Sequence, residues 1–248
     1  MQRAWRLLAL GVAAYLLILT TTFPAARVTG MLEERVSDLS IHAVSGSVFS
    51  GQAGQVTWQD LDLGAVHWQF RPMALLLGSI EYLLELTHPA NHGRLIAGVS
   101  LTGRVYAQDL ELAVLPDRVL NHYSPVAVTT SGELLLAFEE IDLADMFSNT
   151  TTGQLAWRDA VIFEPVDMVL GQLELGVRGT AEELVGEVIE GGELGASGEV
   201  SLSRDNRYLI RLLLQPGNDV SADTLDMLEA AAQMQPNGDY LIEQSGQL

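Results

Sequence analysis

Apolar residues recur at every second position along much of the chain that follows Val44. The clearest run keeps its parity through Val56 and Trp58, slips at Leu61, and resumes at Val66. A period of two is typical of strands that bury one face. The slips in phase near Gln59–Asp60 and Gly64–Ala65 predict a turn and then a bulge or bend.

The same pattern of short apolar runs separated by glycines continues to the C-terminus. Many short strands at roughly regular spacing predict a mainly β fold, with a curved, twisted antiparallel sheet body and a few short helices. We expect one set of side chains to form either the core of this sheet or an apolar groove on it. The set is Val56, Trp58, Leu61, Leu63, Val66, Trp68, Phe70 and Trp157.

A few stretches depart from the alternation. Residues 30–40 have the spacing of a short amphipathic helix, and residues 71–78 predict a helix of one or two turns or a loop. Residues 116–123 predict a turn. The best helix is 221–234, where Ser221 or Asp223 can cap the N-terminus and Pro236 and the residues after it end the helix.

Two decapeptides resemble each other. "GQVTWQDLDL" at 54–63 and "GQLAWRDAVI" at 153–162 share Gly, Gln, Trp and Asp at the same offsets. This similarity suggests two β-rich halves with a join near 116–125. The pair Asp205–Asn206 predicts a hairpin turn between two of the later strands.

The N-terminal segment predicts a membrane anchor. Arg3 and Arg6 precede an apolar run that carries no charge up to Phe23, and Pro24 stands where a helix would stop. With Trp5 the run approaches the ~20 residues that a helix needs to cross a bilayer. The arginines place residues 1–6 in the cytoplasm, 7–24 in the membrane and 25–248 in the periplasm. A cleaved signal peptide ending near Ala25–Ala26 is the alternative.

Composition excludes several classes of protein. The 248 residues carry a net charge of −19 and no Lys, so nucleic-acid phosphates would repel the chain. The chain has no Cys, which excludes disulfides, thiol nucleophiles and thiolate metal sites.

Motifs that carry chemistry are missing from the sequence. His88 and His92 have the spacing of a two-ligand helix face, but Pro89 and Asn91 predict a loop there. The serines in "VSGSVFSG" do not form a nucleophile elbow, and no phosphate-binding loop is present. We therefore expect no catalytic, cofactor-binding or metal-ligating residue and no enzyme activity.

Four stretches together carry a resemblance to a known family: "FPAARVTG", "VSGSVFSGQAGQVTW", "LDLGAVHWQFRPMALLLG" and the closing "NGDYLIEQSGQL". In their order and spacing they resemble protein N of the bacterial type II secretion system (GspN). The resemblance implies a fold similar to AsmA-like β-rich periplasmic proteins. It also implies a single-pass protein of the Gram-negative inner membrane, with a structural or adaptor role beside other subunits of the secretion system. The alternative is an AsmA-like lipid or amphiphile carrier with an apolar groove on the sheet.

Overall fold

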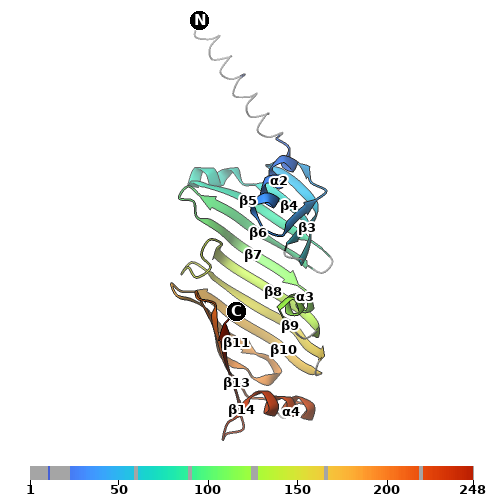
Figure 1. The fold of residues 1–248 in the computed structure, drawn as a ribbon, viewed down its shortest axis with the longest axis vertical. Helices are drawn as coiled ribbons and strands as arrows, with labels where there is room; N and C mark the ends of the chain where they lie inside the picture. Colours follow the sequence, from blue (N-terminus) through green and yellow to red (C-terminus); the bar gives the residue numbers. More distant parts are fainter. Residues whose placement is uncertain are drawn as a thin grey trace. The chain divides into compact units, whose positions relative to one another are not determined.

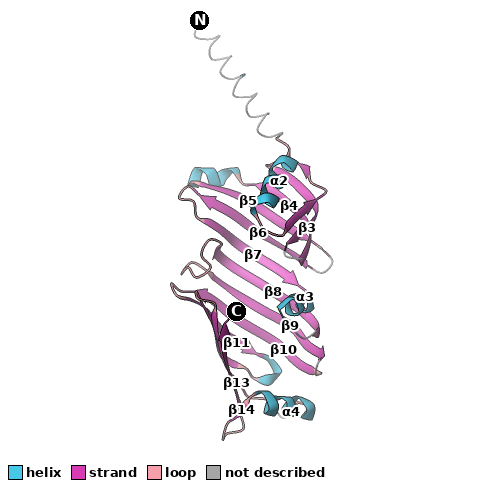
Figure 2. Cartoon of the chain, in the orientation of Figure 1, coloured by secondary structure: helices cyan, strands magenta, loops and turns pink. Residues whose placement is uncertain are grey.

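The computed structural model describes Gly11 and residues 23–58, 61–88, 91–123, 128–164, 167–217 and 220–247. The chain divides into two compact units, Met1–Pro89 and Ala90–Leu248. Antiparallel strands dominate the described residues and a few short helices interrupt them, which confirms the predicted fold class in these terms (Figure 2).

The predicted anchor, residues 7–24, lies almost wholly outside the described residues, as do Arg3, Trp5 and Arg6. Pro24 is described, and it forms an isolated antiparallel bridge with Ser47. Within the described ranges, no helix is both long enough and apolar enough to cross a membrane.

The first unit is a small antiparallel arrangement in the strand order β1-β3-β4-β5, with β2 beside β3 (Figure 1). Its elements are α2 (Ala25–Arg35), β1 (Leu39–His42), β2 (Ser45–Gly46), β3 (Ser50–Trp58), β4 (Leu61–Phe70), the 3₁₀ helix η1 (Pro72–Leu77) and β5 (Ser79–Thr87). The helix or loop expected at 71–78 is thus a 3₁₀ helix. The helix expected at 30–40 begins earlier, at Ala25, and Leu39 starts a strand instead.

Both predicted phase slips correspond to features of the β3–β4 pair. β3 ends at Trp58 and β4 begins at Leu61, its partner across the hairpin. The register shifts twice around the pair Val56–Gly64, because β3 has one extra residue between Ala53 and Val56 and β4 has one extra residue, Leu63, between Asp62 and Gly64. A bulge of this kind moves the apolar set back to its original face.

The second unit follows the strand order β6-β7-β8-β9-β10-β11-β12-β13-β15-β14. Its elements are β6 (Asn91–Ser100), β7 (Val105–Val114), α3 (Pro116–Tyr123), β8 (Thr129–Asp142), β9 (Thr152–Glu164), β10 (Met168–Gly179), β11 (Glu183–Gly191), the 3₁₀ helix η2 (Gly192–Leu194), β12 (Ser197–Ser203), β13 (Arg207–Leu214), α4 (Ala222–Ala231), β14 (Gln233–Met234) and β15 (Tyr240–Gln247). The stretch 116–125, expected as a join, falls within this unit, and α3 occupies most of it instead of a turn.

The local predictions near the C-terminus are confirmed in part. Ser221 caps α4, because its hydroxyl oxygen accepts the backbone N–H of Thr224 at 3.2 Å. Asp205 and Asn206 form the turn between β12 and β13, with Asn206 at a φ of 61°. The helix is shorter than predicted because Ala232 is extended and Gln233–Met234 pair with the start of β15.

The core of the second unit lies where α4 and η2 pack on the sheet. Leu228 of α4 and Leu194 of η2 are buried there with side chains from several strands. The strand members are Ala160, Met168, Leu170, Leu214 and Tyr240. Trp157 packs against the edge of this cluster.

Candidate functional site

The strands of the second unit present one apolar face. Residues that face each other across β7, β8, β9, β10 and β11 form a continuous row: Leu112, Leu136, Leu155, Leu175 and Val188. A neighbouring row two residues along runs through Leu110, Phe138, Val177, Val200 and Ile210. Since successive side chains of a strand point to opposite faces, both rows lie on the same face.

The opposite face of the same strands carries one mainly polar row. Along each strand that they share, this row lies one residue away from both apolar rows. The register aligns Arg94, Glu111, Ala137, Gln154, Gly176, Glu187, Glu199, Arg211 and Glu243. Ion pairs lie near both ends of this row, Arg94–Glu111 at 3.1 Å and Arg211–Glu243 at 2.8 Å. Across these rows the sheet is amphipathic, with charged residues and two cross-strand ion pairs on one side and apolar side chains on the other.

The first apolar row is only half-buried. Each of its five members keeps part of its surface open, and none of them belongs to the core cluster under α4. Side chains of this kind can hold acyl chains or another apolar surface, but they cannot act as acid, base or nucleophile. The face is a candidate binding surface and not a reaction centre.

The three strand tryptophans occupy different environments. Trp68 and Trp157 are half-buried, and each indole N–H donates to a backbone carbonyl, that of Ser47 at 2.9 Å and that of Ser131 at 3.0 Å. Trp58 ends β3 with 43% of its surface exposed.

Glycine makes room for both of the bonded tryptophans. A Cβ on Gly51 would lie 2.4 Å from the ring of Trp68, and a Cβ on Gly132 would lie 2.9 Å from the indole nitrogen of Trp157. Gly51, at the opening of β3, thus has a packing function, because any side chain there would overlap the indole of Trp68.

The other expected core or groove residues belong to the first unit. Val56 is buried, whereas Leu63, Val66 and Phe70 are half-buried. The side chain of Leu61 lies outside the described part of the structure. Phe70 stands between Phe49 and Tyr82, with ring centroids 5.2 Å and 5.5 Å apart, so an aromatic row crosses β4. Burial raises the pKa of Tyr82.

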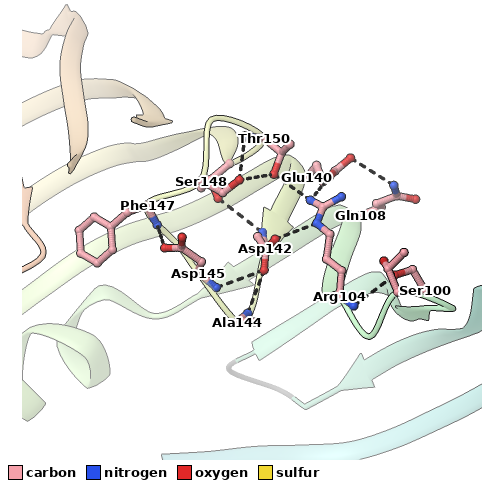
Figure 3. A network of polar contacts seen from close by, with 12 residues as sticks. Ser100, Arg104, Gln108, Glu140, Asp142, Ala144, Asp145, Phe147, Ser148 and Thr150 are labelled. Carbon is pink, nitrogen blue, oxygen red and sulfur yellow. Dashed lines mark hydrogen bonds and ion pairs between the residues drawn. The ribbon is translucent and has the colours of Figure 1, made fainter. Parts of the chain in front are cut away.

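A polar network joins the β6–β7 turn to the end of β8 and to the β8–β9 loop (Figure 3). Arg104, in the β6–β7 turn, donates to Asp142 at 2.7 Å, to Glu140 and to Thr150 at 2.7 Å. Hydrogen bonds from Arg104 hold the pKa of Asp142 below its ordinary value, and the backbone N–H groups of Ala144 and Asp145 act in the same direction.

A second arginine contacts the same β8–β9 loop from the turn between β12 and β13. Arg204, between β12 and β13, donates to Asp145 at 2.7 Å and to the carbonyl of Ala181 at 2.7 Å, and its guanidinium lies 5.1 Å from the ring centroid of Phe147. Both arginines are thus neutralised by carboxylates, so this network holds loops together. No local sequence pattern could reveal it, since its members come from strands far apart in the chain.

The first unit exposes an apolar segment at the end of β4. In η1 and the first residues of β5, large side chains stand free of the core: Met73, Leu75, Leu76, Leu77 and Ile80. Sequence reasoning assigned residues 71–78 no functional role. A run of apolar residues is ordinarily assigned to a core, and only the fold reveals the exposure.

The C-terminal edge of the second unit is open along most of β15. β14 covers only Tyr240 and Leu241, and among the described residues no strand pairs with the outer side of 242–247. A shallow concavity of about 550 Å³ lies nearby, lined in part by Arg207, Tyr208 and Gly246. An open strand edge can accept another strand through its backbone N–H and C=O groups.

No group of three or more His, Asp or Glu side chains in the described ranges is placed to hold a metal ion.

Comparison with known proteins agrees with the resemblance seen in the sequence. The model of the family described as "Type II secretion system (T2SS), protein N" matches residues 37–243. Type II secretion system protein N of Vibrio cholerae serotype O1 is 28% identical over 221 residues, which are 85% of each chain. The protein of the same name from Aeromonas hydrophila is 24% identical over 246 residues, 97% of each chain. No solved structure matches. The chain therefore belongs to the type II secretion system protein N family.

Proposed function

We propose that this component of the type II secretion system is a non-enzymatic adaptor, tethered to the inner membrane by residues 7–24 and exposed to the periplasm from residue 25. The open edge of β15 is the observation that carries the adaptor role. It offers unpaired backbone groups in a fixed line, and strand addition is a common way for one subunit to hold another. Tethering would raise the local concentration of the domain beside other membrane-held subunits.

The adaptor role can be tested with a photo-crosslinking amino acid at Gln244, in the middle of the open edge. We expect crosslinks in native membranes to other subunits of the secretion system. The matched control is the same amino acid at Glu199, which is exposed in the inner strand β12. Equal crosslinking from both positions, or none from Gln244, would count against docking at this edge.

A clean deletion tests the role in secretion itself. We expect the secreted proteins to accumulate in the periplasm, and the intact gene to restore their export. Unchanged secretion would show that the component is dispensable. Fractionation of the same cells tests the tether, because a mature chain beginning near Arg27 would contradict it.

A second function is favoured by the half-buried row of Leu112, Leu136, Leu155, Leu175 and Val188. Such a face could carry a phospholipid or another amphiphile by its acyl chains. After mild extraction we expect lipid in stoichiometric amount by mass spectrometry, and its loss in Leu155→Gln. The control is Gln154→Ala, the neighbouring position on the polar face. A protein that emerges free of lipid would contradict this function.

A further inference from the structure

The segment η1 is unusual because four of its apolar side chains have more than half of their surface exposed. The exposed fractions are 71% for Met73, 54% for Leu75, 78% for Leu76 and 86% for Leu77. Single exposed leucines are common on protein surfaces, but a contiguous group of this kind marks a contact with a partner or with lipid.

The segment η1 is fixed to the first unit by one buried residue, by hydrogen bonds and by an ion pair. Ala74 is buried, and its carbonyl accepts the hydroxyl of Ser79 at 3.3 Å. The same hydroxyl donates to Glu81 at 3.0 Å, and Glu81 pairs with Arg71 at 2.8 Å, which closes the base of the loop. The fold therefore fixes the backbone of a short segment that carries four exposed apolar side chains, and we call this segment the platform.

This platform lies at the same end of the first unit as Phe23 and Pro24, where the proposed tether would join the unit. The carbonyl of Phe23 accepts the N–H of Val48 at 3.0 Å, and the carbonyl of Phe49 accepts the N–H of Phe70 at 2.7 Å. Because Val48 and Phe49 are adjacent, two strand spacings, roughly 10 Å, separate Phe23 from Phe70, the second residue before η1. Figure 1 shows α2 and the 3₁₀ helix at this same end of the unit.

Charge also suits this end to a bilayer surface. From residue 25 to Pro89 the first unit has three Arg and seven acidic residues, a net charge of −4, whereas the second has eight Arg and 25 acidic residues, a net charge of −17. An anionic membrane would repel the second unit strongly and the first only weakly. Between Arg71 and Glu81 no residue is charged.

We propose that the side chains of Met73, Leu75, Leu76 and Leu77 enter the periplasmic leaflet of the phospholipid bilayer. This inference rests on the proposed tether at 7–24. With it, the first unit touches the membrane at two points, the tether and η1, and two contacts fix the orientation of a unit that a single flexible attachment would leave free to turn.

The absence of Cys allows a direct test with single reporters. The full chain carrying Leu76→Cys is labelled with an environment-sensitive fluorophore and reconstituted into vesicles of phosphatidylethanolamine and phosphatidylglycerol. The matched control is Thr87→Cys, an exposed position at the far end of β5, roughly 27 Å from Ser79. Met73→Cys serves as a second reporter if Leu76→Cys folds poorly.

We expect the probe at 76 to shift to shorter wavelength and to lose most of its emission when the vesicles contain spin-labelled lipid. The probe at 87 should change little. If the chain floats with the vesicles and the two probes behave alike, the inference is overturned and the tether stands. A shielded probe at 76 that spin-labelled lipid does not quench would assign the platform to a protein contact instead. A chain that fails to float would overturn both the tether and the inference.

Discussion

In the first unit Trp68 donates its indole N–H to the carbonyl of Ser47, and in the second unit Trp157 does the same with Ser131. In both cases a glycine of the neighbouring strand lies against the ring. The surfaces around this shared arrangement differ: the first unit is weakly acidic and exposes leucines at η1, whereas the second is strongly acidic and covers part of its apolar face with α4. The two units therefore share the contacts that pack a pair of strands, but they differ in the charge and the apolar residues that they expose on their surfaces.

Leu228→Ala should have the largest effect on stability, and it tests the contrast between the covered core of the second unit and the exposed leucines of η1. Leu228 is 3% exposed in the core under α4, so truncation should lower the free energy of unfolding by about 2–5 kcal/mol. Leu77→Ala in the first unit should change it by less than about 0.5 kcal/mol, because Leu77 is almost fully exposed. Urea unfolding in detergent, followed by tryptophan fluorescence, measures both. Similar costs would mean that η1 is part of a core.

Trp68→Phe and Trp157→Phe test the equivalence of the two tryptophans. Each variant removes a donor and leaves a carbonyl of the neighbouring strand without it, so each should cost about 1–2 kcal/mol. Trp58→Phe is the control and should cost about 0.5 kcal/mol or less, since Trp58 is exposed at a strand end. If Trp58 proved as costly as the other two, the equivalence drawn from the structure would be wrong.

Asp142→Asn tests whether the second unit depends on its ion pairs. The pKa of Asp142 is lowered in the folded state, so its contribution is present above the ordinary Asp value near 3.9 and disappears as the pH falls through the lower, folded-state value. The variant should therefore cost about 1–2 kcal/mol at pH 7 and progressively less below about pH 4. Urea midpoints at several pH values measure this.

The companion variant for that experiment is Arg104→Gln, which removes the cation and keeps the carboxylate. Its cost should shrink over the same pH range, because protonation of Asp142 removes the ion pair between Asp142 and Arg104 from the wild-type protein as well. A cost that stays constant with pH would show that packing of the β8–β9 loop, and not charge, gives the network its effect.

Leu76→Gln should have the smallest effect of all on stability, within about 0.5 kcal/mol, as for other surface substitutions. The measurement is again urea unfolding in detergent. A large loss would mean that η1 packs against the unit, and the contrast between an exposed platform and a covered core would fail.

Local patterns predicted much of the fold. Alternation located strands, a shift in parity located the bulge at Gly64, and the side chain of Ser221 marked the start of α4. These features depend on neighbours within a few residues. The two similar decapeptides, 54–63 and 153–162, nevertheless have different local structures. The first segment breaks after Trp58 into a hairpin, whereas the second continues through Asp159, at a φ of 49°, as one strand.

Most of the candidate site lies beyond such patterns. Arg104 and Asp142 are 38 residues apart, and Arg204 and Asp145 are 59 apart. Only the strand order brings them together, and in a chain with 32 acidic residues no single carboxylate stands out. The exposure of Leu76 and Leu77 is likewise a property of the folded surface, because the same letters would suit a buried helix.

In the second unit each strand from β7 to β13 pairs with the strand that precedes it in the chain, and β15 alone reaches past α4 to pair with β13. Such a meander has low contact order, so strands can add one after another as the chain emerges with its N-terminus first. Leu228 and Tyr240, which help to cover the apolar face, emerge near the very end. A chain that ends before α4 would therefore lack Leu228 and Tyr240, and it would expose the core cluster in addition to the half-buried row that stays open in the whole unit. Docking of α4 and β15 is therefore the step that closes the core cluster of this unit.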